Sequence, residues 1–206
     1  MMNISVIGAG YVGLITGIGF AKLNHQVSIV DLNDDLIKNL NENRPPFYEP
    51  ELVDYLNDSN IRNNLFFSTS YQKSINENTD IVFVCVQTPT DPDTGKTKTD
   101  YISSVLTELK KIESFNFIIC IKSTIKATLV EKISNEIDLD YKKIIFNPEF
   151  LREGSAFYDF FNPDRIVIGG SDQKGLNQCT ELYESFDCEK IITDSNSSQM
   201  IKYLSN

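Results

Sequence analysis

The chain has 206 residues, of which 41% are hydrophobic, and a formal net charge of −10 at pH 7. This length fits one large domain, or one domain with part of another. The negative charge argues against nucleic acid and membrane surfaces as partners, because both are polyanionic. The cysteines lack the paired spacing of metal ligands, so we expect no metal site and a reduced, cytoplasmic protein. They are Cys85, Cys120, Cys179 and Cys188.

The first predicted elements are a strand over residues 3–7, a glycine-rich turn and an apolar-periodic helix that runs to Leu23. In a G-x-G-x-x-G turn, the first glycine permits the tight turn and the second lets backbone N–H groups approach a pyrophosphate. The third lets the helix lie close to the strand. The helix N-terminus also favours the negative charge of a diphosphate. We therefore predict a dinucleotide site formed by Gly8, Gly10, Tyr11, Val12 and Gly13.

An acidic residue, Asp31, follows the second predicted strand, which covers residues 27–30. It lies about 20 residues beyond the glycines, where a carboxylate can accept hydrogen bonds from both hydroxyls of an adenosine ribose and repels a 2′-phosphate. The predicted cofactor is therefore NAD rather than NADP. The competing interpretation is an ordinary glycine-rich turn with an unrelated acid at a strand end.

Strand and helix patterns alternate along the rest of the chain. This alternation predicts an α/β fold, a Rossmann-type doubly wound parallel sheet with helices on both faces. Right-handed crossovers favour a six-stranded core in the order 3-2-1-4-5-6, with added strands that begin around Lys143 or Arg165. The later strands are predicted at residues 65–68, 80–86, 116–121, 143–147 and 164–168.

Three polar loops follow strands at their carboxyl ends, the edge where open α/β sheets bind ligands. We expect one site at this edge, with a short insertion around residues 45–50 beside the nucleotide. The loops contain Thr88-Pro89-Thr90, Lys122-Ser123-Thr124 and Asn147-Pro148-Glu149.

The last segment has a cap-rich start at Ser195 and then apolar residues at helical spacing. We expect residues 1–194 to form the NAD-binding Rossmann-like domain. Residues 195–206 are expected to be the start of a truncated central helix that leads to a C-terminal half outside this sequence.

Motifs spread over nearly the whole chain resemble those of one family. They are the glycine-rich turn, Tyr48-Glu49-Pro50, residues 64–69, the three polar loops, and a long run over residues 147–169 that includes Asn-Pro-Glu-Phe-Leu-Arg-Glu-Gly and Pro-Asp-Arg-Ile-Val-Ile-Gly. The chain resembles the N-terminal half of the UDP-glucose/GDP-mannose dehydrogenase family. This resemblance implies oxidation of the C6 alcohol of a nucleotide sugar to a carboxylate in two hydride transfers to NAD. It is strongest to the members that convert UDP-glucose to UDP-glucuronate.

The resemblance also implies site residues. Thr124 matches the threonine that helps to hold the catalytic water, and Glu153 matches the glutamate that acts through this water as acid and base. Lys202 matches the lysine that stabilises the oxyanion, and Asn206 matches its hydrogen-bonding partner. Substrate binding is implied for Glu149, Phe150, Leu151, Glu153 and Lys202. Cofactor binding is implied for the glycine-rich turn with Asp31, Thr88, Pro89, Thr90, Thr124 and Glu153.

Local chemistry agrees in outline but leaves alternatives open. If Pro148 begins a helix, Glu149 and Glu153 share one face, as do Lys202 and Asn206. The two glutamates could instead only favour a helix N-terminus. Lys202 could be a solvated helix residue, and Thr124 could be a helix cap. Arg152 and Arg165 are interpreted as ion-pairing residues that could also reach a phosphate.

Two features depart from the family pattern. Gln199 stands where relatives often carry a glutamate, and none of the four cysteines has the glycine-rich context of the family's nucleophile. We therefore expect a piece of a longer enzyme, a homodimer at full length, that binds cofactor without turnover and leaves Lys202 and Asn206 loosely held. Two alternatives stay open. The first is another nucleotide sugar, either GDP-mannose or a UDP-N-acetylhexosamine, and the second is a stand-alone NAD-binding regulatory module.

Overall fold

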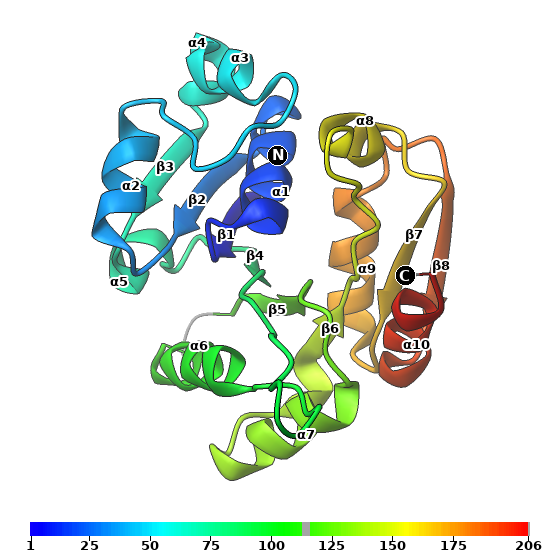
Figure 1. The fold of residues 1–206 in the computed structure, drawn as a ribbon. Helices are drawn as coiled ribbons and strands as arrows, with labels where there is room; N and C mark the ends of the chain where they lie inside the picture. Colours follow the sequence, from blue (N-terminus) through cyan, green and yellow to red (C-terminus); the bar gives the residue numbers. More distant parts are fainter. Residues whose placement is uncertain (113–115, 206) are drawn as a thin grey trace.

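The fold is an α/β arrangement around one eight-stranded sheet, seen in a computed structural model that describes residues 1–112 and 116–205 (Figure 1). The strand order is β3-β2-β1-β4-β5-β6-β7-β8. The strands are β1 Asn3–Ile7, β2 Gln26–Val30, β3 Leu65–Ser68, β4 Ile81–Val84, β5 Ile118–Ile121, β6 Ile144–Phe146, β7 Arg165–Gly169 and β8 Glu189–Thr193.

The first six strands are parallel, and their order confirms the predicted Rossmann-type core. The sheet then continues through β7, which pairs antiparallel with β6, and β8, which pairs parallel with β7. The central strands β4 and β5 are buried along their whole length, as their nearly continuous apolar runs predict. Strand β8 was not predicted, because its charged, half-buried sequence carries only a weak strand pattern.

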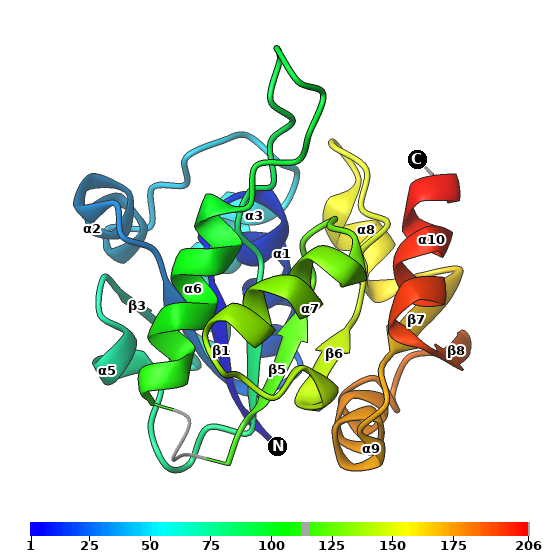
Figure 2. The same cartoon turned by 90° about the horizontal axis from the view of Figure 1, so that it is seen from below.

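Helices cover both faces of the sheet (Figures 1 and 2). Helices α1, α8 and α9 pack on one face with α2, α3 and α4 near them, and α5, α6 and α7 pack on the other. Helix α10 begins at Ser195, where the sequence predicted a helix, and lies against β7, β6 and α7. The helices are α1 Tyr11–Lys22, α2 Asp34–Asn41, α3 Leu52–Asn57, α4 Ser59–Arg62, α5 Tyr71–Ser74, α6 Asp100–Lys111, α7 Ala127–Glu136, the 3-10 turn η1 Tyr141–Lys143, α8 Ala156–Phe161, α9 Gln173–Leu182 and α10 Ser195–Ser205.

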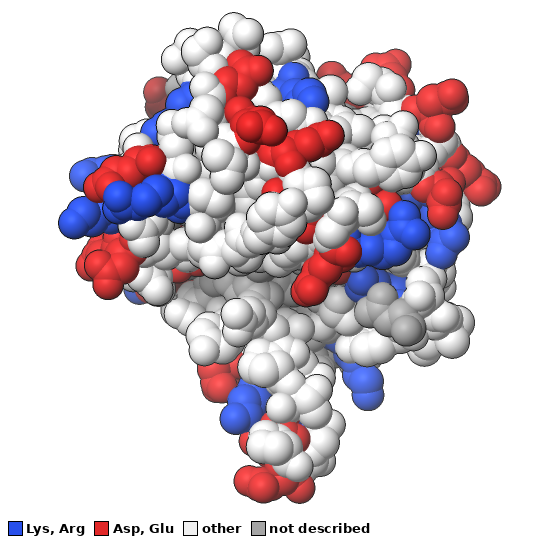
Figure 3. Space-filling model, turned by 45° about the horizontal axis from the view of Figure 1, so that its top comes forward, with Lys and Arg blue, Asp and Glu red and all other residues white. Residues whose placement is uncertain are grey.

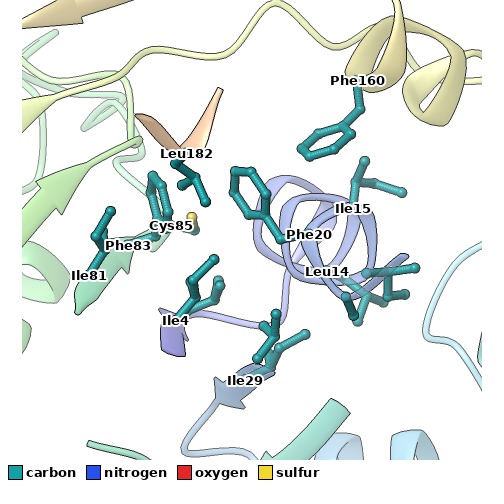
Figure 4. Packing of buried hydrophobic residues seen from close by; sticks show 14 of the residues in the cluster. Ile4, Leu14, Ile15, Phe20, Ile29, Ile81, Phe83, Cys85, Phe160 and Leu182 are labelled. Carbon is teal, nitrogen blue, oxygen red and sulfur yellow. The ribbon is translucent and has the colours of Figure 1, made fainter. Parts of the chain in front are cut away.

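The core beneath α1 is organised around Phe20 (Figure 4). Its ring stacks on Phe83 of β4 at a centroid distance of 5.6 Å and meets the edge of Phe160 of α8 at 5.2 Å. Gly19, beside Phe20, leaves the space that the Phe160 ring occupies, because a Cβ there would overlap this ring. The contact holds α8, and the loop that precedes it, against the helix that follows the glycine-rich turn.

The loops after β1, β2, β4, β5 and β6 all leave the carboxyl edge of the sheet, and several lie together at the top of Figure 2. The loop between β4 and α6 projects furthest in this view, with Thr90 and Thr97 paired across it. No helix among the described residues is long and apolar enough to cross a membrane. On the face in Figure 3, Lys and Arg side chains are interspersed with Asp and Glu.

Candidate active site

The glycine-rich turn has three glycines that are needed for three different physical reasons. Gly8 has a φ of +100°, and a Cβ there would lie 2.8 Å from the carbonyl oxygen of Cys85. A Cβ at Gly13 would overlap the carbonyl oxygen of Gly8. A Cβ at Gly10, by contrast, would meet no protein atom within 4 Å. Gly8 and Gly13 are therefore required by the fold, whereas the space beside Gly10 is open to a ligand.

Asp31 connects the end of β2 to this turn. Its Oδ2 accepts a hydrogen bond from the backbone N–H of Ala9 at 2.9 Å, and its Oδ1 accepts one from Asn33 at 3.0 Å. A carboxylate has about four lone-pair sites, so about two remain for ribose hydroxyls. The following helix α2 has two acidic residues, Asp34 and Asp35, in its first turn, which add negative charge shortly after Asp31.

The loops after β4 and β5 are joined by side-chain hydrogen bonds. The Thr88 hydroxyl donates to the carbonyl oxygen of Thr124 at 2.8 Å, and the Ser123 hydroxyl donates to that of Val86 at 2.6 Å. Helix α7 has Lys126 as its N-cap residue, so Thr124 does not cap it. Thr88 and Thr124 are thus brought together as predicted, while Thr90 lies further out on the exposed hairpin.

The segment from Asn147 to Ser155 is an irregular loop, so the condition that Pro148 begins a helix is not met. Buried Asn147 fixes its start, because its Nδ2 donates to the carbonyl oxygen of Val167 at 2.9 Å. Its Oδ1 accepts from Lys122 Nζ at 2.9 Å and from the Tyr183 hydroxyl at 2.6 Å. Long-range side-chain contacts therefore override the local helix-start pattern, and Glu149 and Glu153 share no helix face.

Lys202 and Glu149 form a buried ion pair with an Nζ–Oε1 distance of 2.8 Å, and their side chains are 6% and 12% exposed. Oε2 of Glu149 accepts a further hydrogen bond from the backbone N–H of Leu151 at 2.8 Å. The Lys202 ammonium also lies 5.5 Å from the centre of the Phe150 ring. The expectation that Lys202 would be loosely held is therefore wrong. Helix α10 packs on β7, and this packing places Lys202 beside the loop that contains Glu149.

This pair borders a cavity of about 530 Å³. Phe150, Leu151, Arg165 and Lys202 line it, together with buried Lys122. Arg165 lies 5.0 Å from the Phe150 ring and donates to the Ser205 hydroxyl at 2.9 Å. It forms no ion pair with any residue that the structure describes, unlike the interpretation from sequence. The cavity thus combines an aromatic ring with cationic groups and with the carboxylates of Glu149, Asp159 and Asp164, which suits a ligand with polar and ring-shaped parts.

Glu153 lies between two fixed neighbours. The Arg152 backbone N–H donates to Asp159 at 2.9 Å, and the Arg152 guanidinium forms an ion pair with the same carboxylate at 2.6 Å. This guanidinium holds the pKa of Asp159 below its usual range, chiefly through the hydrogen bond. Within residues 1–112 and 116–205, no hydrogen bond or ion pair holds the exposed Glu153 carboxylate. Asn206, the predicted partner of Lys202, lies outside the described residues.

The sequence over residues 2–187 matches the model of the UDP-glucose/GDP-mannose dehydrogenase family, NAD binding domain. The chain belongs to this family. It is 36% identical over 213 residues to UDP-glucose 6-dehydrogenase YwqF of Bacillus subtilis and 35% identical over 215 residues to UDP-glucose 6-dehydrogenase of Rhizobium meliloti. These alignments cover 100% of this chain and 47% and 49% of the relatives.

Solved structures of the family share the fold. GDP-mannose dehydrogenase from Pseudomonas aeruginosa superposes with a TM-score of 0.90 at 28% identity, over 98% of this chain and 49% of that one. UDP-glucose dehydrogenase from Pyrobaculum islandicum gives a TM-score of 0.89 at 33% identity, over 100% of this chain and 49% of that one. The chain therefore spans about half the length of these dehydrogenases.

NAD is the cofactor of this family domain, and the residues present fit it. The open space at Gly10 admits a pyrophosphate to the N-terminus of α1, and the remaining lone pairs of Asp31 suit the adenosine ribose. Among the described residues, no cluster of three His, Cys, Asp or Glu side chains could hold a metal ion.

Glu49 is the residue whose importance the sequence did not indicate. It is only 3% exposed, and its carboxylate accepts hydrogen bonds from the Tyr11 hydroxyl and from backbone N–H groups of the loop that carries Glu153. The available signal was its place in Tyr48-Glu49-Pro50, one of the motifs shared with the family, for which the resemblance implied no role. Its partners more than a hundred positions away could not be inferred from spacing.

Proposed function

We propose that this chain is the NAD-binding part of a UDP-glucose 6-dehydrogenase, which oxidises UDP-glucose to UDP-glucuronate in two hydride transfers. One observation carries the proposal. The loop of residues 147–155 borders the lysine-containing cavity on one side and contacts Tyr11 of the dinucleotide turn on the other, with the Tyr11 hydroxyl 3.1 Å from the Arg152 carbonyl oxygen. NAD bound at the turn supplies the hydride acceptor for the alcohol carbon of a sugar held in the cavity.

We assign the following roles to residues of this chain within that proposal. Lys202 stabilises negative charge on the substrate oxygen, and its pairing with Glu149 holds the ammonium in a low-dielectric site. Glu153 moves protons through a water molecule, a role supported by its exposed carboxylate, which makes no hydrogen bond or ion pair with the described residues. Thr124 helps to hold this water, and Phe150 and Leu151 contact the nucleotide sugar.

The choice of UDP-glucose is supported by two relatives, 36% and 35% identical to this chain, that are UDP-glucose 6-dehydrogenases. A second candidate substrate is GDP-mannose, which the TM-score of 0.90 with a GDP-mannose dehydrogenase favours. For either substrate, we propose that the NAD-binding domain ends at residue 194 and that the central helix begins at residue 195.

We further propose that the 206-residue chain alone does not sustain turnover. Oxidation beyond the aldehyde needs an accessible thiolate. Burial raises the pKa of the Cys85 thiol to about 12 and also raises the pKa of Cys120, while Cys179 is fully buried. Partial burial likewise raises the pKa of Cys188. Incubation with NAD and UDP-glucose should give no more than one equivalent of NADH per chain, and many equivalents with UDP-glucuronate as product would refute this.

The complete protein is proposed to be a cytoplasmic homodimer. The exposed apolar side chains of Ile192, Met200 and Leu204 on β8 and α10 support a covered surface there, and the free cysteines support a reducing compartment. Light scattering of the complete protein at several concentrations tests the dimer, and a monomer at every concentration would contradict it.

The test of the proposed function combines cofactor and substrate binding. NADH fluorescence titrations should show binding by the chain and loss of binding by Gly10→Ala, which has an allowed φ of −73° and should fold normally. With NAD present, saturation-transfer NMR should detect UDP-glucose more strongly than UDP-N-acetylglucosamine, which has the same base. If the Gly10→Ala variant bound NADH as tightly as the unmodified chain, the proposed cofactor site would be refuted. If the chain preferred GDP-mannose to UDP-glucose, GDP-mannose would become the proposed substrate.

A further inference from the structure

Glu49 has the structural features of an anchor that connects the cofactor turn to the loop carrying Glu153. Its Oε2 lies 2.9 Å from the Tyr11 hydroxyl and 2.9 Å from the backbone nitrogen of Gly154, and its Oε1 lies 2.8 Å from that of Ala156. We call these four residues the Glu49 network. It joins three segments that are far apart in the sequence: the start of α1, the insertion before α3, and the loop before α8.

The burial of this carboxylate requires an explanation. A buried carboxylate is costly unless it is paired or fully hydrogen-bonded. Within residues 1–112 and 116–205, no Lys or Arg pairs with Glu49, so the three donors of the network compensate its charge. Hydrogen bonds to an ionised acceptor are shorter and stronger than neutral ones. The same contact raises the pKa of the Tyr11 hydroxyl, together with burial, which is the larger cause.

The Glu49 network fixes the backbone next to Glu153, the proposed proton-transfer residue, but not the Glu153 side chain. Gly154, whose φ is +87°, directly follows Glu153 and donates to Glu49, while Arg152 directly precedes Glu153 and donates to Asp159. The peptide group after Glu153 is held through the Gly154 N–H, and the one before it is held because the Arg152 carbonyl oxygen accepts from the Ser155 N–H at 3.1 Å. Among the residues that the structure describes, the Glu153 carboxylate itself has no hydrogen bond or ion pair. This combination positions a side chain that must remain free to act.

We propose that Glu49 is a positioning residue, which sets the place of Glu153 relative to the cofactor bound at the glycine-rich turn. The inference rests on the proposed role of Glu153. It assigns no contact between Glu49 and substrate or cofactor, because Glu49 acts through Tyr11 and the backbone of residues 154–156.

A double-mutant cycle read by NADH affinity tests this proposal. The chain has no tryptophan, so nucleotide fluorescence is measured without interference from indole. We expect Glu49→Gln to weaken NADH binding about tenfold when Glu153 is present and by less than about twofold in the Glu153→Gln background. A purely structural role predicts the same loss in both backgrounds.

Glu51→Gln is the matched control. Glu51 is exposed, lies two residues further on and also accepts a hydrogen bond from a tyrosine, Tyr55, at 2.6 Å, but it does not touch the network. Its variant should bind NADH within about twofold of the unmodified chain. Hydrogen exchange should show loss of protection at the Gly154 and Ala156 amides in Glu49→Gln and retained protection in Glu51→Gln.

The outcomes separate this proposal from the function on which it rests. If the unmodified chain does not bind NADH, the proposed function fails and the inference fails with it. Three results with a chain that binds NADH would overturn only the positioning role. They are an unchanged NADH affinity in Glu49→Gln, the same loss of NADH affinity in both backgrounds, and an unchanged NADH affinity in Glu153→Gln alone. If Glu49→Gln does not fold, Tyr11→Phe, which removes one of the three hydrogen bonds, takes its place in the cycle with the same criteria.

Discussion

The buried ion pair between Lys202 and Glu149 gives a stability prediction whose magnitude follows from its surroundings. Removing one member of a buried pair typically costs about 3–5 kcal/mol, because the other charge is left unpaired. In Lys202→Met, the Glu149 carboxylate would keep its hydrogen bond from the Leu151 N–H and would still border the cavity, where water can reach it. The lower value, about 3 kcal/mol, is therefore expected. Glu149→Leu leaves the Lys202 ammonium without a carboxylate and should cost more, about 4 kcal/mol.

The double variant Lys202→Met/Glu149→Leu removes both charges. It should recover to within about 1 kcal/mol of the unmodified chain, because apolar side chains of similar size replace a desolvated pair at little cost. Urea unfolding followed by far-UV circular dichroism gives these free energies, provided that the m-values agree. Arg152→Met is the control: it breaks an ion pair whose arginine side chain is 73% exposed, and its unfolding midpoint should hardly move. Additive losses in the double variant would refute the description of Lys202 and Glu149 as a coupled buried pair.

The remaining predictions concern the glycine-rich turn and the single histidine. Gly13→Ala should destabilise the chain or prevent its folding, because a Cβ there overlaps the Gly8 carbonyl oxygen, and a melting temperature close to that of the unmodified chain would contradict this close approach. Burial lowers the pKa of His25, whose Nδ1 accepts a hydrogen bond from the Met2 backbone N–H, so the unfolded chain takes up this proton more readily than the folded one. Stability should therefore fall as the pH is lowered through the ordinary value of 6.5 toward the lower folded pKa, and His25→Gln should remove this component from urea unfolding curves recorded between pH 5 and pH 7. An unchanged pH dependence in His25→Gln would show that other groups are responsible.

The parts of the fold that could be predicted from sequence are those set by local pattern and general topology. The glycine-rich turn between β1 and α1 has a spacing that few other structures require, and the apolar runs of β4 and β5 indicate central strands. Right-handed crossovers then leave few possible strand orders, which is why the six-stranded core was predicted correctly. The edge strand β8 has neither a continuous apolar run nor a clear alternation, so it was missed.

The candidate site was predictable as a set of residues but not as an arrangement. Pro148 followed by Glu149 is a typical helix start, yet Asn147 is held by Val167, Lys122 and Tyr183, and these contacts keep the segment irregular. The burial of Lys202 likewise depends on how α10 packs against β7, which its own sequence does not specify. The roles of Thr124, Glu153 and the cofactor loop residues stay predictions until binding is measured.

We propose that the glycine-rich turn and Asp31 form an NAD site, and a calorimetric titration of the 206-residue chain with NAD and with NADP tests this site most directly. The Asp31 carboxylate, held by the Ala9 and Asn33 N–H groups, should accept the ribose hydroxyls and repel a 2′-phosphate. NAD is therefore expected to bind at least about tenfold more tightly than NADP. Asp31→Ala should lower the affinity for NAD and reduce the ratio of the NAD affinity to the NADP affinity. Equal affinity for the two nucleotides, or no binding of either, would contradict the account.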